Sequence, residues 1–228
     1  CCTVYIVPLT FKASRFMVSV QVDGKHKCGG FLIDRSFVLT AAHCYRNECG
    51  HWNSFQQNPA QYRYEVKGNH THKLYKNPET GYDIMILELV KKVHLSNDVM
   101  IVPFSEQDGN VEAHRRCQVA GWGKTEHSQK AVSDLMVTDV SVISFNTCKT
   151  LWGQVDKILP PGVMCAGGSE DSGVCQGDSG GPLVCDGVAV GIVSFNYDCN
   201  CRYPNVPNVY TKIAEYRTWI DGVVDKGV

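Results

Sequence analysis

Long apolar runs, an excess of one charge and internal repeats are all missing from this sequence of 228 residues. No stretch of about 20 apolar residues is present, so we expect no membrane as a partner. The 22 basic and 23 acidic side chains nearly balance, and the formal net charge of −1 gives no electrostatic reason to expect nucleic acid as a partner. What remains is a globular protein with 43% hydrophobic residues, enough for a sizeable core.

Cysteine, by contrast, is abundant. The twelve cysteines are scattered at long spacings, and the close C-x-x-C pairs typical of zinc sites are absent. We therefore expect a disulfide framework without a metal or other cofactor, in a secreted or granule protein. A glycosylation triplet beginning at Asn69 fits that localisation.

Short apolar or alternating runs between turn residues predict an all-β chain. A helical period appears once, over Lys212–Val224, where apolar residues recur at i, i+3, i+4 spacing. The polar stretch Ser105–Arg116 is the candidate interdomain linker. The expected strands are Phe16–Val22, Phe37–Ala42, Asp83–Val90, Gln118–Gly121, Val137–Val142, Pro182–Val184 and Val188–Phe195.

A glycine-rich segment, residues 177–181 (GDSGG), precedes one of these strands. A serine hydroxyl is a weak nucleophile, which needs a base and backbone N–H groups aimed at the developing oxyanion. Glycines beside Ser179 allow a tight turn that brings two N–H groups to one point, and Gly177 and Ser179 would supply them. Taken alone, the segment is explained equally well by a glycine-rich hairpin turn.

His43 and Asp83 are the candidates for the base and for the group that orients it. His43 follows an apolar strand and two small residues, and a disulfide at Cys44 would fix it within about 3 Å of the hydroxyl. Asp83 begins the apolar run Ile84–Leu87, where a buried carboxylate requires a partner such as an imidazole. On its own, Asp83 could instead cap a strand at the surface.

Together the three groups run His, Asp, Ser along the chain, the order of the chymotrypsin-type triad. From about Ser14 onward the sequence resembles the trypsin/chymotrypsin family of serine proteases. The resemblance implies two antiparallel six-stranded β-barrels, with the site between them and a C-terminal α-helix. The segments that carry it are Cys28–Ile33, Leu39–Cys44, Asp83–Leu87, Ala120–Gly123, Met164–Gly168, Gly177–Val184, Val193–Phe195 and Val209–Lys212.

The resemblance also divides the chain. Residues 14–106 would form the N-terminal barrel, and residues 107–228 the C-terminal barrel and helix. Residues 1–13 would be a leader or an atypical N-terminal segment, because the apolar stretch Cys1–Thr10 fits either the tail of a signal peptide or an ordinary first strand. The sequences of Ser14–Ser19 and Cys28–Asp34 resemble those of granzymes and mast-cell proteases, a branch of immune granule proteases.

A disulfide pattern is implied by the same resemblance. Cys1, Cys2, Cys49 and Cys201 are left unassigned, and Cys201 could compete with Cys199 for Cys175. The implied pairs are Cys28–Cys44, Cys117–Cys185, Cys148–Cys165 and Cys175–Cys199.

The implied activity is that of a monomeric serine endopeptidase that cleaves polypeptides through an acyl-enzyme on Ser179. Protein inhibitors of proteases are further candidate partners. The backbone of Ser194, Phe195 and Asn196 would pair with an extended substrate as an added strand.

The implied specificity pocket carries no charge. Gly173 falls at the pocket floor, where tryptic enzymes have a carboxylate, and Val174 would line an apolar wall. Asn196 and Asn208 would either narrow the pocket or turn to solvent. We therefore expect cleavage after medium-sized uncharged residues, not after Arg or Lys.

Two features depart from the family pattern. Activation in the family pairs a new N-terminal ammonium with the carboxylate beside the nucleophile, here Asp178. This chain has Ile6–Leu9, reading IVPL, where the family has Ile/Val-x-Gly-Gly. In addition, Tyr45–Tyr64 lacks the usual valine-rich strand, so we expect an incomplete or rearranged first barrel. The alternative function is therefore a zymogen-like or catalytically silent binding protein on the same fold.

Overall fold

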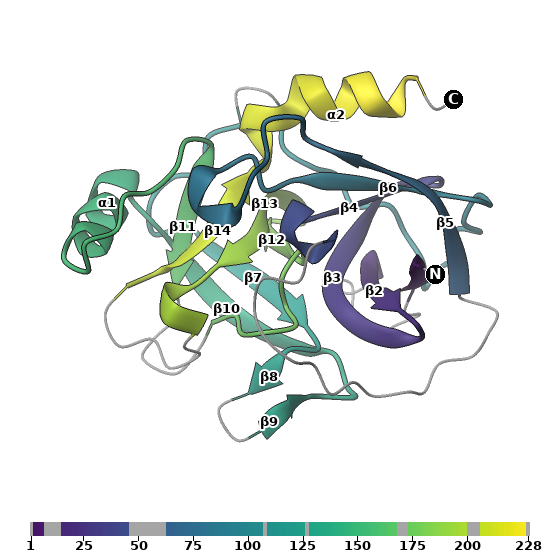
Figure 1. Cartoon of the computed structure of the whole chain (residues 1–228), viewed down its shortest axis with the longest axis horizontal. Helices are drawn as coiled ribbons and strands as arrows, with labels where there is room; N and C mark the ends of the chain where they lie inside the picture. Colours follow the sequence, from purple (N-terminus) through teal and green to yellow (C-terminus); the bar gives the residue numbers. More distant parts are fainter. Residues whose placement is uncertain are drawn as a thin grey trace.

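Two closed β-barrels make up most of the computed structural model (Figure 1). The structure describes residues 2–6, 15–45, 63–106, 109–125, 128–167, 173–199 and 206–226. The strand orders are β1-β2-β3-β4-β6-β5 and β10-β11-β14-β13-β12-β7, and β8-β9 form a separate two-stranded sheet. The predicted fold class, all-β with two six-stranded barrels and a C-terminal helix, is confirmed.

The first barrel is closed by β1, which pairs with β2 on one side and with β5 on the other. Of the two expected alternatives, the incomplete first barrel is wrong and the rearranged one is confirmed, because the N-terminal end of the chain supplies a strand. Residues 46–62 lie outside the described part of the chain. The strands of this barrel are β1 (Cys2–Ile6), β2 (Met17–Val22), β3 (Lys25–Asp34), β4 (Phe37–Thr40), β5 (Arg63–Thr71) and β6 (Met85–Leu89).

The second half of the chain carries both α-helices: α1 packs against β11 of the second barrel, whereas Ile220 of α2 belongs to the core cluster of the first barrel (Figure 1). No helix in the described ranges is long and apolar enough to cross a bilayer. The elements of this half are β7 (Arg116–Gly121), β8 (Lys124–Thr125), β9 (Ser128–Ala131), β10 (Met136–Ile143), α1 (Phe145–Gly153), β11 (Val163–Gly167), β12 (Pro182–Cys185), β13 (Val188–Phe195), β14 (Asn208–Lys212) and α2 (Arg217–Val224).

The sequence patterns found seven strands and the C-terminal helix and left β1 as one of two alternatives, but they missed β3, β5, β8, β9, β11, β14 and α1. The sequence patterns did not predict β5 because its exposed and half-buried residues alternate. Arg63, Glu65 and Lys67 face outward, and the strand has no fully buried apolar face. The helix expected over Lys212–Val224 begins as a 3-10 turn, Ile213–Tyr216, and continues as α2.

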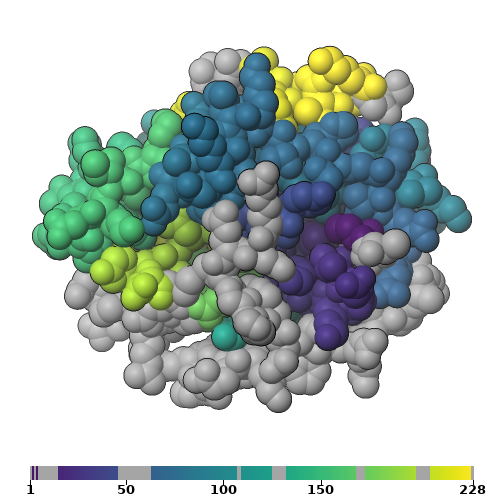
Figure 2. All heavy atoms as spheres, in the orientation of Figure 1, coloured from purple at the N-terminus to yellow at the C-terminus, as the bar shows by residue number. Residues whose placement is uncertain are grey.

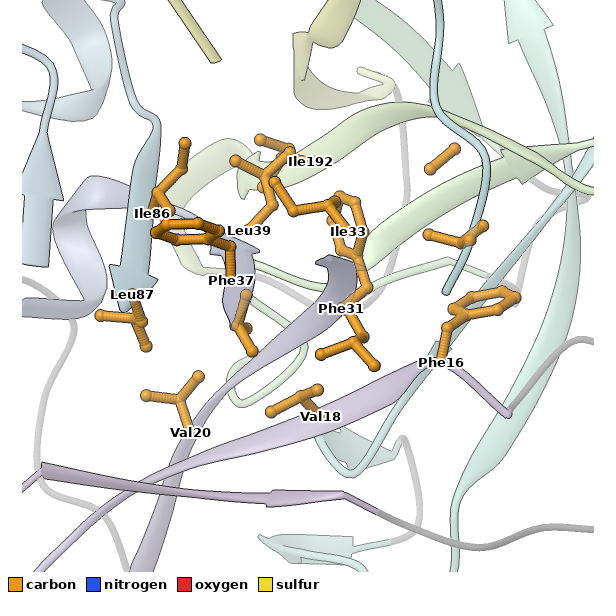
Figure 3. Close-up of a cluster of buried hydrophobic side chains, with 14 of the residues drawn as sticks. Phe16, Val18, Val20, Phe31, Ile33, Phe37, Leu39, Ile86, Leu87 and Ile192 are labelled. Atoms are coloured by element: carbon orange, nitrogen blue, oxygen red, sulfur yellow. The ribbon is translucent and has the colours of Figure 1, made fainter. Parts of the chain in front are cut away.

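Large apolar side chains from neighbouring strands fill the first barrel (Figure 3). Phe31 of β3, Phe37 of β4 and Ile86 of β6 are at most 1% exposed. Ile192 of β13 belongs to the same cluster although it comes from the second barrel. A few side chains of the second barrel therefore join the core of the first, which holds the two halves of the site together, while separate clusters fill the second barrel.

Removing a large side chain from this core should be costly. We expect Phe31→Ala to lower the free energy of unfolding by about 3–5 kcal/mol, because the side chain is fully buried and its loss leaves a cavity. Phe145→Ala is the matched control, since Phe145 at the start of α1 is 49% exposed and should cost about 0.5 kcal/mol. Urea unfolding followed by tryptophan fluorescence measures both, and equal losses would contradict this account of the core.

Candidate active site

His43 and Asp83 are brought together by adjacent strands of the first barrel. His43 lies in the 3-10 turn Ala42–Tyr45 after β4, and its neighbour Cys44 is disulfide-bonded to Cys28 of β3. Asp83 precedes β6, the strand that pairs with β4. His43 Nδ1 lies 2.7 Å from Asp83 Oδ2, and the His43 backbone N–H donates to Asp83 Oδ1 at 2.9 Å. Both carboxylate oxygens therefore contact one residue, which fixes the orientation of its imidazole.

The Asp83 carboxylate is buried, with only 1% of the residue exposed. Ser194 Oγ donates to Asp83 Oδ2 at 2.5 Å, and Thr211 Oγ1 donates to the Asp83 carbonyl oxygen at 2.9 Å. Burial raises the pKa of Asp83, but the charge of His43 and hydrogen bonds from His43 and Ser194 outweigh it, so the pKa is lowered. The carboxylate is an anion at neutral pH and can hold the imidazole with its proton on Nδ1.

Ser179 lies in a turn of the second barrel that packs directly on the first. Gly177 and Gly180 have φ values of 104° and 80°, a region that favours glycine. A Cβ on Gly180 would lie 2.2 Å from Thr40 Oγ1. The Gly29 backbone N–H donates to the Ser179 carbonyl oxygen at 2.8 Å. The glycines therefore allow an approach to the first barrel that any side chain would prevent.

His43 and Ser179 line one cavity of about 520 Å³, whose walls come from both barrels. No hydrogen bond joins the Ser179 hydroxyl to the His43 imidazole in the described ranges, and such contacts are often loose before a substrate binds. In those ranges, the backbone N–H groups of Gly177 and Ser179 donate no hydrogen bond. Both could therefore donate to an oxyanion.

The two barrels also meet across the outer part of this cavity. On the face shown in Figure 2, segments of the first barrel (blue) abut segments of the second barrel (green). Glu79 and Lys157, which both line the cavity, form an ion pair of 3.1 Å between the barrels. Both side chains are largely exposed, so the pair adds about 1 kcal/mol at most to stability.

Asp178 carries a second carboxylate next to the proposed nucleophile. Its Oδ1 accepts from the Gly123 N–H at 2.7 Å and its Oδ2 from the Cys175 N–H at 2.9 Å. The residue is partly exposed as a whole, but a Cβ on Gly121 would lie only 1.9 Å from Oδ1, so the carboxyl group is enclosed. Burial raises the pKa of Asp178 to about 6, and the two backbone hydrogen bonds offset only part of this. No cation contacts it in the described part of the chain.

Sequence reasoning missed His26 and Ser19, and it gave Ser194 a backbone role only. His26 Nε2 lies 2.9 Å from the Gly177 carbonyl oxygen, which can only accept, and His26 Nδ1 lies 2.8 Å from Ser19 Oγ. Burial lowers the pKa of His26 to about 4, despite the hydrogen bond to Gly177. The residue is therefore neutral at pH 7 and supports the turn that holds Ser179. The period of two that places His26 on the same face as Cys28 was the one signal that could have found it.

The predicted substrate-binding residues divide into two groups. Gly173 and Asn208 are not among the described residues that line the cavity. Asn196 Nδ2 donates to the Val174 carbonyl oxygen at 3.4 Å, so this amide lies along the wall. Asn208 is fully buried, which excludes the solvent-directed alternative, and neither of its amide atoms has a hydrogen-bond partner within the structure as described. The predicted residues that do line the cavity are Val174, Ser194, Phe195 and Asn196.

Three of the four implied disulfides are formed. Cys175 is disulfide-bonded as well, whereas the side chain of Cys199, its implied partner, lies outside the described part, as do Cys1, Cys49 and Cys201. Cys2 is a free, exposed thiol. Asn69 is exposed on β5. The formed pairs are Cys28–Cys44, Cys117–Cys185 and Cys148–Cys165.

Comparisons with known proteins agree with this architecture. The family model described as Trypsin matches residues 7–220. Azurocidin from Homo sapiens is 33% identical over 228 residues, which cover 92% of this chain and 82% of that protein. Trypsin-3 from Salmo salar is 35% identical over 222 residues, which cover 93% of this chain and 88% of that protein.

Solved structures give the same result. A mutant of human heparin binding protein superposes with a TM-score of 0.79 and 31% identity, covering 98% of this chain and 96% of that one. Mouse neuropsin, titled a serine protease, gives a TM-score of 0.79 and 29% identity, covering 97% of this chain and 98% of that one.

The unpaired state of Asp178 makes stability depend on pH. A carboxyl group whose pKa rises from 3.8 to about 6 on folding stabilises the fold at low pH, and this contribution is lost as the pH rises through about 6. Asp178→Asn cannot ionise. The free energy of unfolding of the variant, minus that of the wild type, should therefore increase between about pH 4 and pH 6 by about 1.4 kcal/mol per pH unit.

Urea unfolding at a series of pH values measures this difference. A difference that decreases over the same range would mean that a cation holds the carboxylate as an anion, in conflict with the contacts described above.

Proposed function

The chain belongs to the trypsin family, and we propose that it is a serine endopeptidase whose catalytic residues are Ser179, His43 and Asp83. The observation that carries this proposal is the buried His43–Asp83 pair, 2.7 Å apart, on a cavity that Ser179 also lines. In a family that acts on polypeptides, such a pair is the base and its orienting group.

The chemistry follows from the roles of these side chains. His43 Nε2 removes the proton of the Ser179 hydroxyl as its oxygen attacks a peptide carbonyl carbon, and Asp83 stabilises the resulting imidazolium. The N–H groups of Gly177 and Ser179 bind the oxyanion. His43 then protonates the leaving amine, and water hydrolyses the acyl-enzyme by the same path.

The proposed specificity is for medium-sized uncharged residues on the amino side of the cleaved bond. Val174 and Val193 supply apolar walls to the cavity, and Asn196 lies along one of them. Asn208 precedes Val209, the residue of β14 that pairs with Phe195, and its side chain is buried and uncharged. None of these residues carries a negative charge that would hold an Arg or Lys. The acidic residues that line the cavity, Glu79 and Asp198, are outside this set, and Glu79 is paired with Lys157.

We also propose a compartment, an oligomeric state and a class of inhibitor for this protein. Its disulfides favour an oxidising compartment, so we place it outside the cell or in a secretory granule, with Asn69 as a glycosylation acceptor. We propose a monomer that protein inhibitors can block by entering the cavity as substrate-like strands. The division into residues 14–106 and 107–228, with 1–13 as an N-terminal segment, is likewise proposed.

A second candidate is a zymogen-like or catalytically silent binding protein. The observation that favours it is the enclosed Asp178 carboxylate, which contacts backbone N–H groups and no cation in the described ranges. Some similar solved structures are titled heparin binding protein, which names a binding function. The missing Ile/Val-x-Gly-Gly motif agrees with this candidate.

Active-site labelling separates the two candidates. We expect a fluorophosphonate probe to label the wild type on Ser179, because an activated serine attacks phosphorus as it attacks a carbonyl. Labelling should vanish in Ser179→Ala and persist in Ser141→Ala, a matched serine of β10. Absence of labelling in a wild type shown to be folded would favour the second candidate.

Peptide-library digestion tests the specificity. The wild type should cleave after medium-sized uncharged residues, and Asn196→Gly should raise cleavage after Phe or Tyr by about tenfold, because it clears one wall of the cavity. Asn110→Gly, an exposed asparagine, is the matched control. Dominant cleavage after Arg or Lys by the wild type would overturn the proposed pocket.

A further inference from the structure

The backbone immediately before Asp83 is left-handed over two residues. Gly81 has a φ of 82° and Tyr82 a φ of 58°. Glycine adopts this conformation readily, but a tyrosine does so at a cost, because its Cβ crowds the following carbonyl oxygen. Six described non-glycine residues have a positive φ, and all except Tyr82 are Asp or His, types enriched there. Tyr82 is thus the one exceptional residue of this set, and it adjoins the proposed catalytic aspartate.

This conformation determines where Asp83 points. The Ile84 N–H donates to the Tyr82 carbonyl oxygen at 2.8 Å, so Asp83 is the central residue of a tight three-residue turn. The Thr211 hydroxyl donates to the Asp83 carbonyl oxygen and holds the other side of that residue. With its main chain held on both sides, Asp83 directs its carboxylate to the two nitrogens of His43.

Aromatic side chains hold Tyr82 in this conformation. Its ring stacks on the His72 imidazole, with centroids 4.9 Å apart and an interplanar angle of 13°, and meets the Tyr216 ring edge-on at 6.1 Å. The phenolic oxygen of Tyr216 is hydrogen-bonded to the Tyr82 backbone. Trp219 of α2 covers the outer side of His72, with centroids 5.3 Å apart.

The position of the Tyr216 oxygen is itself fixed. A Cβ on Gly162, whose φ is 69°, would lie 2.3 Å from this oxygen, so the glycine makes room for it. Tyr216 is 5% exposed, and burial raises its pKa to about 12, so the phenol keeps its proton. The titratable groups that face Tyr82 are then His72, Tyr216 and Asp83. Burial and the neighbouring Lys73 lower the pKa of His72, so it is neutral at pH 7.

From these contacts we infer that Tyr82 is a positioning residue for Asp83: its left-handed backbone, held by His72 and Tyr216, aims the carboxylate at His43. The inference rests on the proposed function for its catalytic consequence. Its geometric content, that the conformation of Tyr82 sets the His43–Asp83 contact, does not depend on activity. Backbone conformations that are unfavourable in themselves often occur at active sites, where the surrounding structure holds them in place. Tyr82 is such a residue.

The experiment compares two substitutions at Tyr82 with one elsewhere. Tyr82→Val places a β-branched residue where φ is positive, which forces the backbone to change. Tyr82→Gly also removes the ring but permits the left-handed conformation. His114→Val is the matched control, because His114 is exposed before β7, away from the site, and has a φ of 68°.

Two readouts are used on the full chain. The first is the second-order rate of labelling by the fluorophosphonate probe as a function of pH, with the wild type and Ser179→Ala establishing whether the chain is active. The second is the pKa of His43 from an NMR titration of the imidazole resonances, assigned with His43→Ala. The second readout needs no catalytic activity, so it tests the inference even if the wild type is inert.

We expect Tyr82→Val to lower the labelling rate on the order of 100-fold, the effect of a small misplacement of a catalytic group. It should also lower the pKa of His43 by about one pH unit, because an imidazolium loses the adjacent anion. Tyr82→Gly should recover a large part of both values. His114→Val should lose stability as Tyr82→Val does, while its pH profile and the pKa of His43 match those of the wild type.

Two results would overturn the inference. In the first, the pKa of His43 in folded Tyr82→Val equals that of the wild type. In the second, Tyr82→Gly changes this pKa as much as Tyr82→Val does, which would assign the effect to the lost ring and not to the backbone. Failure of the wild type to label would count against the proposed function alone.

Discussion

The buried negative charge of Asp83 is the constraint around which the site is arranged. A carboxylate in the protein interior is costly unless hydrogen-bond donors surround it. The first barrel supplies two of them from His43, and the second supplies the hydroxyl of Ser194, while the Thr211 hydroxyl holds the main-chain carbonyl oxygen of Asp83. Because the compensation comes from both barrels, the charge is stabilised only when they are docked. Assembly of the fold and assembly of the site are therefore one event.

A second buried carboxylate shows what the imidazole contributes. The Asp178 carboxylate accepts two hydrogen bonds from backbone N–H groups, and the Asp83 carboxylate accepts three, two of them from His43. Burial acts to raise the pKa of both. Only Asp83 has a positively chargeable neighbour, and only its pKa ends below the ordinary value. Of these two carboxylates, Asp83 is thus an anion at neutral pH, whereas Asp178, next to Ser179, has a pKa of about 6. The same fold can therefore support an active or a zymogen-like site, depending on whether a cation pairs with the Asp178 carboxylate.

Sequence patterns sufficed for the groups proposed to do the chemistry. His43, Asp83 and Ser179 each have a local signature: small residues before a cysteine, a carboxylate leading an apolar run, and a serine among glycines. The groups that support them have no such signature. His26 meets Gly177 at a separation of 151 residues, and Thr211 meets Asp83 at a separation of 128. Contacts of this kind depend on the completed fold, so no local pattern predicts them. The fold class was predictable because most strands carry an apolar period, whereas β5, whose residues alternate between exposed and half-buried, does not and was missed.

Closure of the first barrel by β1 has a consequence for how the chain folds. β1 pairs with β5, and Thr3 lies opposite Glu65, so this ladder joins segments that are far apart in sequence. Non-local pairings of this type form slowly, because loop entropy is lost before the contacts are gained. The barrel cannot close until β5 has been synthesised and β1 has paired with it. Before then the unpaired strand edges are exposed, and exposed edges can pair with other chains. During biosynthesis, the interval before β1 docks is therefore when this protein is most exposed to aggregation and most dependent on chaperones.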